Sequence, residues 1–86
     1  MFLTLGQSAA IPASAIIGIF DFEKTTRSRK ARNFLKRAED EGRVVSVTGG
    51  GPPRAYVVTE EDGATRVYLT RLAAATLAKR KELIDR

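Results

Sequence analysis

Residues 24–42, KTTRSRKARNFLKRAEDEG, carry the clearest structural signal of the chain. Ser28 or Thr26 is suited to cap the first turn of a helix, and Gly42 is placed to end it as the C′ residue. The apolar residues recur at the i, i+3, i+4 and i+7 spacing of one helical face: Ala31, Phe34, Leu35 and Ala38. The spacing therefore predicts an amphipathic helix.

The charges of this helix run against its dipole. Seven lysines and arginines precede the first acid of the segment, which closes on Glu39, Asp40 and Glu41. Acids near the N-terminus and bases near the C-terminus stabilise a helix by about 0.3–1 kcal/mol each, so the order here is the unfavourable one. An anionic or acidic partner is one explanation, and a solvated face whose order is accidental is the other.

The bases form two ridges when the helix is drawn at 100° per residue. Arg29, Arg32 and Lys36 fall together on the outer side, and Lys30 and Arg37 lie on one flank. We expect both ridges to face solvent.

The remainder of the composition limits what this helix can belong to. With 86 residues, 43% of them hydrophobic and 29% charged, residues 1–86 read as one small folded domain, of a size at which oligomerisation is a common source of stability. The formal charge of +5 is concentrated: residues 1–23 carry two acids and no base, residues 24–37 carry seven bases, and residues 38–86 carry eight of each. A clustered basic excess is typical of nucleic-acid binding, although not specific to it.

The chain contains no cysteine and no histidine. Disulfides, thiolate nucleophiles, imidazole bases and nearly all zinc or transition-metal sites are thereby excluded, so we expect no enzyme, cofactor, metal or small-molecule substrate. The longest apolar run, residues 9–20, is too short for a bilayer crossing and lacks the basic flank of a signal peptide. A cytoplasmic protein without a membrane partner is expected.

Strand and turn patterns occupy the rest of the chain. MFLTL at residues 1–5 predicts a strand ended by a turn at GQSAA, and the apolar run at residues 15–22 predicts a central strand buried on much of both faces. RVVSVT at 43–48 and RAYVVTE at 54–60 predict a hairpin around GGGPP, and Asp62-Gly63 predicts a second turn before TRVYLT at 65–70. Residues 72–86 are alanine-rich and predict a helix that buries Leu77 and Ile84. The fold expected is α+β, in the order ββαβββα, with a small, mostly antiparallel sheet and two helices.

Three further groups of residues have a functional and a structural interpretation. Gly49, Gly50 and Gly51 can bring bare amides close to a phosphate, but no nucleotide fingerprint follows them, and a hairpin tip explains them as well. Asp21 and Glu23 could be an acid/base pair, or a strand end that pairs with a neighbouring subunit's arginine. Tyr56 and Tyr68 could stack bases, or pack across strands. The bases at residues 79–81 of the last helix suit its dipole.

Five segments resemble the bacterial extracellular matrix regulators of the RemA/RemB family, and more closely its RemB branch: MFLTLG, IIGIFDF, NFLKRAEDEGRVV, RAYVVT and VYLTRLAAATLAKR. The most specific are IIGIFDF and the TLAKR ending. The resemblance covers nearly the whole chain and implies a protomer of a ring-shaped homo-oligomer that binds double-stranded DNA as a transcriptional regulator of biofilm matrix genes.

The resemblance also implies DNA-contacting arginines in the loop before the RAYVVT strand, and one before the IIGIFDF strand. Arg54 matches the last loop arginine, whereas its neighbours are glycine and proline, and Ala15 stands before the strand. A DNA-binding surface made of the bases Arg29, Lys30, Arg32, Lys36 and Arg37 together with Arg54 is therefore expected, with the helix taking the larger share. The rival is an oligomeric interaction module in which the acids of one helix meet the bases of the next copy, without DNA.

Overall fold

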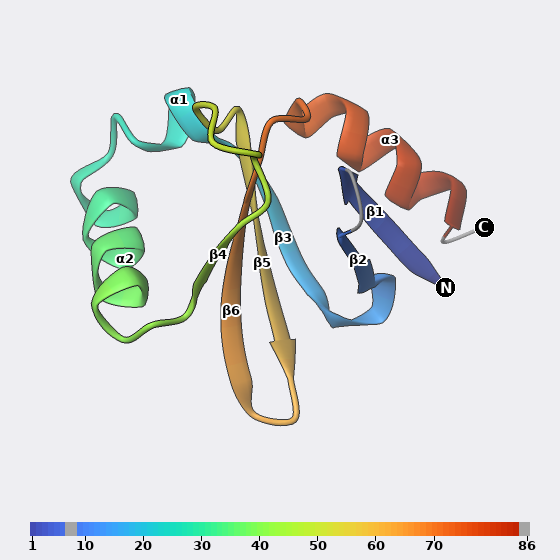
Figure 1. Cartoon of the computed structure of the whole chain (residues 1–86), viewed down its shortest axis with the longest axis horizontal. Coiled ribbons are helices and arrows are strands. Elements are labelled where there is room, and N and C mark those ends of the chain that lie inside the picture. The colour runs from blue at the N-terminus through green and yellow to red at the C-terminus, as the bar shows by residue number, and fades with distance from the viewer. Residues whose placement is uncertain (7–8, 85–86) are drawn as a thin grey trace.

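The computed structural model describes residues 1–6 and 9–84 of the chain. In this part the fold is α+β, with two sheets and three α-helices (Figure 1). The elements follow one another as β1 (Phe2–Gly6), β2 (Ala9–Pro12), the 3-10 helix η1 (Ala13–Ala15), β3 (Ile16–Asp21), α1 (Phe22–Thr25), α2 (Arg29–Asp40), β4 (Val44–Ser46), β5 (Ala55–Glu61), β6 (Ala64–Thr70) and α3 (Ala74–Ile84).

The larger sheet has the strand order β3-β5-β6-β4, and β1 and β2 pair separately as an antiparallel hairpin. The prediction that the IIGIFDF run forms a central buried strand is wrong, because β3 lies at an edge and Ile17 is 60% exposed. The central position belongs to β5, whose first five residues are buried. A register irregularity lies between Ile16 and Gly18, and Ile17 at that point of the strand is exposed.

The predicted hairpin between residues 43–48 and 54–60 is also wrong. β4 pairs in parallel with β6, Val44 opposite Val67 and Ser46 opposite Leu69, so the sheet is mixed. β5 has no free edge for β4, because β3 occupies one side and β6 occupies the other. The free edge of β6 is the position that remains, and the loop of residues 47–54 carries the chain back across the sheet.

The predicted turn at Asp62-Gly63 is confirmed. Glu61 is opposite Ala64, so these two residues form the whole loop between β5 and β6. Both have positive φ, 53° for Asp62 and 80° for Gly63, as a two-residue hairpin with the native strand twist requires.

Three short elements were not predicted: β2, η1 and α1. β2 begins at Ala9 and pairs with β1, so Ala9 and Ala10 of the predicted turn are strand residues, while Gln7 and Ser8 lie outside the described residues. α1 is a single turn that begins because the Asp21 carboxylate accepts a hydrogen bond from Lys24 N at 2.8 Å. These elements are too short to show a helical or strand period.

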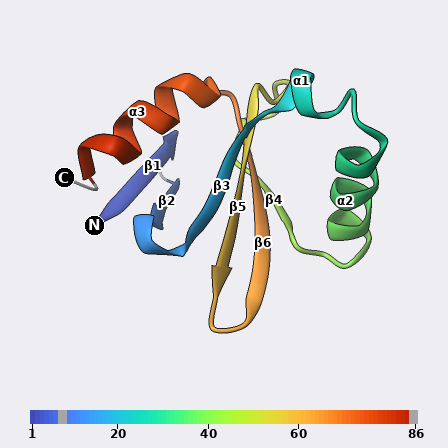
Figure 2. The same ribbon diagram turned by 180° about the vertical axis from the view of Figure 1, so that it is seen from behind.

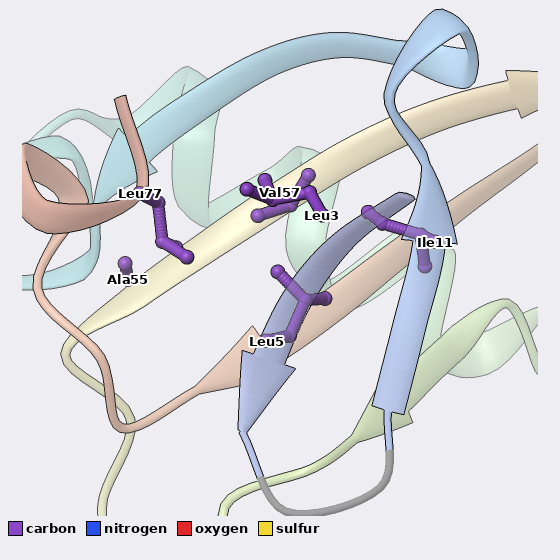
Figure 3. Close-up of a cluster of buried hydrophobic side chains, with 6 residues drawn as sticks. All are labelled: Leu3, Leu5, Ile11, Ala55, Val57 and Leu77. Carbon is purple, nitrogen blue, oxygen red and sulfur yellow. The ribbon is translucent and has the colours of Figure 1, made fainter. Parts of the chain in front are cut away.

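The larger sheet separates two hydrophobic cores, one on each face (Figures 1 and 2). The first core lies between the β1–β2 hairpin, β5 and α3, and Figure 3 shows its buried side chains converging there: Leu3, Leu5, Ile11, Ala55, Val57 and Leu77. The Thr70 hydroxyl, fully buried, donates to Leu5 O at 2.6 Å and ties the hairpin to β6. The prediction that Leu77 and Ile84 face the core is confirmed, while Asp85 and Arg86 of that predicted helix lie outside the described residues.

The second core lies on the α1 and α2 side of the sheet and is smaller. Its buried residues are Ala38, Tyr56, Val58 and Val67, with Phe22, Leu35, Val44 and Leu69 partly buried around them. The Phe20 ring stacks on Tyr56 with centroids 5.1 Å apart, and Phe22 meets the same ring edge-on at 6.3 Å. Aromatic contacts from β3 and α1 thus supply much of this packing.

Candidate nucleic-acid interface

The predicted helix and both of its ends are confirmed in α2. Ser28 is the N-cap, and its hydroxyl accepts a hydrogen bond from Ala31 N at 3.4 Å. Gly42 follows the helix with φ of +71°, a conformation that glycine adopts without steric cost. Ala38 is fully buried and Leu35 partly buried, whereas Phe34 of the predicted apolar face is 37% exposed. The helix therefore contacts the sheet along a narrow line.

All five bases singled out on α2 are exposed, but their side chains are not equally engaged. Arg32 Nη1 donates to Thr26 O at 2.7 Å and Arg27 O at 3.0 Å, so this guanidinium holds the α1–α2 connection. Lys36 Nζ lies 3.6 Å from an Asp40 carboxylate oxygen. Within residues 1–6 and 9–84 the side chains of Arg29, Lys30 and Arg37 make no hydrogen bond or ion pair. Those three are the cations most available to a partner.

A cleft of about 350 Å³ separates part of α2 from the sheet. Thr26, Arg32, Lys36 and Glu39 line it together with the apolar side chains of Phe22, Leu35, Val44 and Leu69. Arg29, Arg32 and Lys36 are all exposed, and two of them, Arg32 and Lys36, border the cleft.

The glycine-rich loop of residues 47–54 contains an internal hydrogen bond between a threonine side chain and the backbone. Gly49 and Gly50 have φ of +71° and +95°, and Gly50 N donates to the buried Thr48 hydroxyl at 3.3 Å. One of the amides proposed for phosphate contact is thus already bonded. The hairpin-tip interpretation is wrong as well, because the loop joins two strands that do not pair.

Arg54 lies at the end of this loop and is exposed. Its backbone connects three elements: Arg54 N donates to Thr70 O at 2.8 Å, and Arg54 O accepts from Phe22 N at 3.0 Å. The side chain therefore starts from a fixed point beside α1, at the same end of the sheet as Thr70.

Acidic side chains concentrate toward one end of the larger sheet. Figure 1 shows α1 and the loop of residues 47–54 at one end and the β5–β6 turn at the other, with α2 running from the first toward the second. Arg43 Nη1 donates to Thr65 O at 3.3 Å, which places the C-terminus of α2 beside the turn end of β6. Six acids gather toward that end: Glu39, Asp40, Glu41, Glu60, Glu61 and Asp62. Arg29 and Lys30, in the first turn of α2, and Arg54 lie toward the other end, whereas Arg37 lies in the last turn of α2.

The remaining interpretations are decided by contacts. Asp21 caps α1, and Glu23 lies 3.7 Å from Arg27 of its own chain, so both carboxylates have local partners. Tyr56 is opposite Leu69 and Tyr68 is opposite Val57, on neighbouring registers of adjacent strands. Tyr56 packs into the second core and Tyr68 against the first, so the two rings lie on different faces and cannot form one stacking platform.

One exposed base at the loop was missed. Arg71 follows β6 directly, and its guanidinium lies against Gly51. The sequence places Arg71 seventeen positions after Arg54, and only the register of β5 on β6 brings them to one place. Only a correct prediction that Ala55 pairs with Thr70 would have placed Arg71 beside the loop.

Fold and surface together define a class: a small α+β domain with a basic surface on one helix and one loop end. No helix in the described ranges combines the length and apolar character needed to cross a bilayer.

The model of the RemA-like family, described as extracellular matrix regulatory protein A-like, matches residues 2–80. Extracellular matrix regulatory protein B of Bacillus subtilis (strain 168) is 31% identical over 84 residues, which cover 98% of this chain and 94% of that protein. The chain belongs to the RemA-like family of extracellular matrix regulators.

Proposed function

We propose that this protein is a non-enzymatic, self-associating regulator of the RemA/RemB type that binds double-stranded DNA, mainly through its phosphates. Membership of a family of matrix regulators supports a regulatory role in matrix gene expression. Each protomer would contribute a few phosphate contacts, and the ring that the resemblance implies would add them into a usable affinity.

The observation that carries the proposal is the position of the free bases on α2. Arg29 and Lys30 stand in the first turn, where the helix dipole disfavours a positive charge, and no acid accompanies them there. A phosphate placed against this turn would be attracted both by the side chains and by the dipole. The dipole of α2 is not stabilised by cations in its first turn.

The helix has to supply most of the contact because the family's other cations are absent. Ala15, where the resemblance implies an arginine, is buried in η1, and the loop holds Arg54 but no neighbouring arginine. α2 and the loop end are therefore the surfaces to test.

The test is the affinity for a duplex of about 30 base pairs as a function of salt, for the native chain and for Arg29→Ala/Lys30→Ala. The logarithm of the association constant falls with the logarithm of salt concentration by about 0.9 for each neutralised phosphate. We expect the double variant to bind more weakly and with a flatter slope, while its fold is kept, because alanine is favourable in a first turn.

A matched control removes the same charge elsewhere. Arg66→Ala/Lys79→Ala also deletes one arginine and one lysine, both exposed, and these residues belong to β6 and α3 rather than to α2 or the loop of residues 47–54. We expect this variant to retain most of the native slope. Equal losses in the two variants would indicate attraction by net charge alone, and absence of DNA binding by the native chain at 50 mM salt would refute the proposal.

An oligomeric scaffold without DNA binding is the second candidate, and the two open sheet edges favour it. Ile17 at the β3 edge is 60% exposed and Val45 at the β4 edge is 39% exposed, so each edge offers apolar surface to another copy. Arg29 and Lys30 at the start of α2, and Glu39 and Asp40 at its end, also suit head-to-tail contact between copies. Light scattering is expected to give a smaller mass for Ile17→Lys than for the native chain. A native chain that forms a stable assembly but does not bind DNA would favour the scaffold function over the DNA-binding function.

A further inference from the structure

The side chain of Arg71 occupies the space that Gly51 leaves empty. A Cβ atom built on Gly51 would lie 3.0 Å from Arg71 Nε and 3.2 Å from its Cζ. Gly51 is not among the residues with positive φ, so its backbone conformation would accept other amino acids. The missing side chain of Gly51 therefore leaves room for the guanidinium of Arg71, which follows β6.

Arg54 and Arg71 stand beside each other where β5 begins and β6 ends. Ala55 pairs with Thr70 in the β5–β6 register, and Arg54 N donates to Thr70 O at 2.8 Å, so the backbones of Arg54 and Arg71 lie close together. Like charges held close together repel each other. Two neighbouring arginines therefore add no stability to the isolated chain.

No acid in the described part of the chain relieves this repulsion. Neither guanidinium makes a hydrogen bond or ion pair there, and both residues are exposed. The nearest acid in the register is Asp21, opposite Ala55 on β3, and its carboxylate is bonded to Lys24 N at 2.8 Å. Two exposed guanidinium groups without a partner in the described residues therefore stand at this end of the sheet.

We propose that Arg71 and Arg54 together bind one phosphate group of the DNA backbone, with Arg71 reaching over Gly51 to supply the cation that the glycine-rich loop lacks. Guanidinium groups suit this task because their planar donors match phosphate oxygens in pairs. A bound phosphate would also remove the repulsion between the two arginines. This inference rests on the proposed function and assigns it a residue outside both α2 and the loop.

Three single variants and one double variant test it, each measured for duplex affinity against salt. Arg71→Ala is expected to weaken binding about tenfold at 100 mM salt and to flatten the slope by about one phosphate per protomer engaged. Arg66→Ala is the matched control, since Arg66 is an exposed arginine in β6 itself, toward the β5–β6 turn and away from Arg71, and it should change affinity less than about threefold. Arg71→Lys should keep the slope and lose part of the affinity, because it preserves the charge without the paired donors.

The decisive variant is Gly51→Arg/Arg71→Ala, which moves the guanidinium from the strand end to the loop. Because the alanine vacates the space beside residue 51, the new arginine can take it, and we expect affinity to return to within threefold of the native value. A purely structural role of Arg71 would not be rescued in this way. Equal effects of Arg71→Ala and Arg66→Ala, or failure of the rescue in a folded double variant, would overturn the inference while leaving DNA binding by α2 intact. Loss of all DNA binding by the native chain would overturn both.

Discussion

The helices α3 and α2 flank opposite faces of one sheet and are built in opposite ways. α3 buries Leu77 completely in the first core, and its basic residues lie in its second half, where they suit the dipole. α2 buries only Ala38, leaves a cleft of about 350 Å³ beside the sheet, and carries its bases at the unfavourable end. The comparison separates two tasks: one face of the sheet holds the fold together, and the other presents charge.

Shortening the leucine on each helix is expected to give the largest difference between the two faces. Leu77→Ala should lower the free energy of unfolding by about 2–5 kcal/mol, because it opens a cavity in the first core. Leu35→Ala should cost about 1 kcal/mol, since Leu35 is only partly buried and already borders the cleft. Urea denaturation followed by circular dichroism measures both, and equal costs would mean that α2 is held as firmly as α3.

The buried hydroxyl of Thr70 offers a polar test of the first core. Thr70→Val keeps the shape of the side chain but leaves Leu5 O and Leu72 N without their partner, at a cost of about 1–3 kcal/mol. Thr65→Val on the same strand is the control, because Thr65 is only partly buried, and it should change stability by less than about 0.5 kcal/mol. A thermal denaturation midpoint that is the same for both variants would show that the bond does not hold the hairpin to β6.

Reversing one charge on each helix should give the smallest effects and opposite signs. Arg29→Glu places an acid in the first turn of α2 and is expected to raise the free energy of unfolding by about 0.3–1 kcal/mol. Lys81→Glu, in the last turn of α3, should lower it by a similar amount. Chemical denaturation at low salt measures both differences. If Arg29→Glu destabilised the protein, the native order of charges on α2 would stabilise the fold. That order would then no longer indicate an anionic partner.

Local patterns in the sequence predicted the elements whose causes are local. The Ser28 cap and Gly42 end of α2, the Asp62-Gly63 turn and the apolar stripe of α3 through Leu77 all follow from residues within a few positions of one another. The pairing of β4 with β6 could not be predicted in this way, because it depends on which sheet edges the other strands leave free. For β3, an apolar run indicated a central buried strand, but the strand lies at an edge of the sheet and Ile17 is exposed.

The candidate site likewise contains features that follow from local sequence and features that depend on distant contacts. The exposure of the α2 bases follows from the helical period alone, whereas the engagement of Arg32 with Thr26 O and Arg27 O depends on how the chain turns before the helix. The position of Arg71 depends on contacts between still more distant parts of the chain, because Arg71 reaches Gly51 only through the β5–β6 register and the path of the loop.

The first core draws its residues from both ends of the chain, and this sets the order in which the protein can be completed during synthesis. Leu3, Leu5 and Ile11 leave the ribosome early, but Val57 and Leu77 are needed to cover them. The β5–β6 hairpin, closed by two residues, can form as soon as its own strands emerge. β1 and β2 must therefore wait with Leu3, Leu5 and Ile11 uncovered until the chain has been made through Leu77.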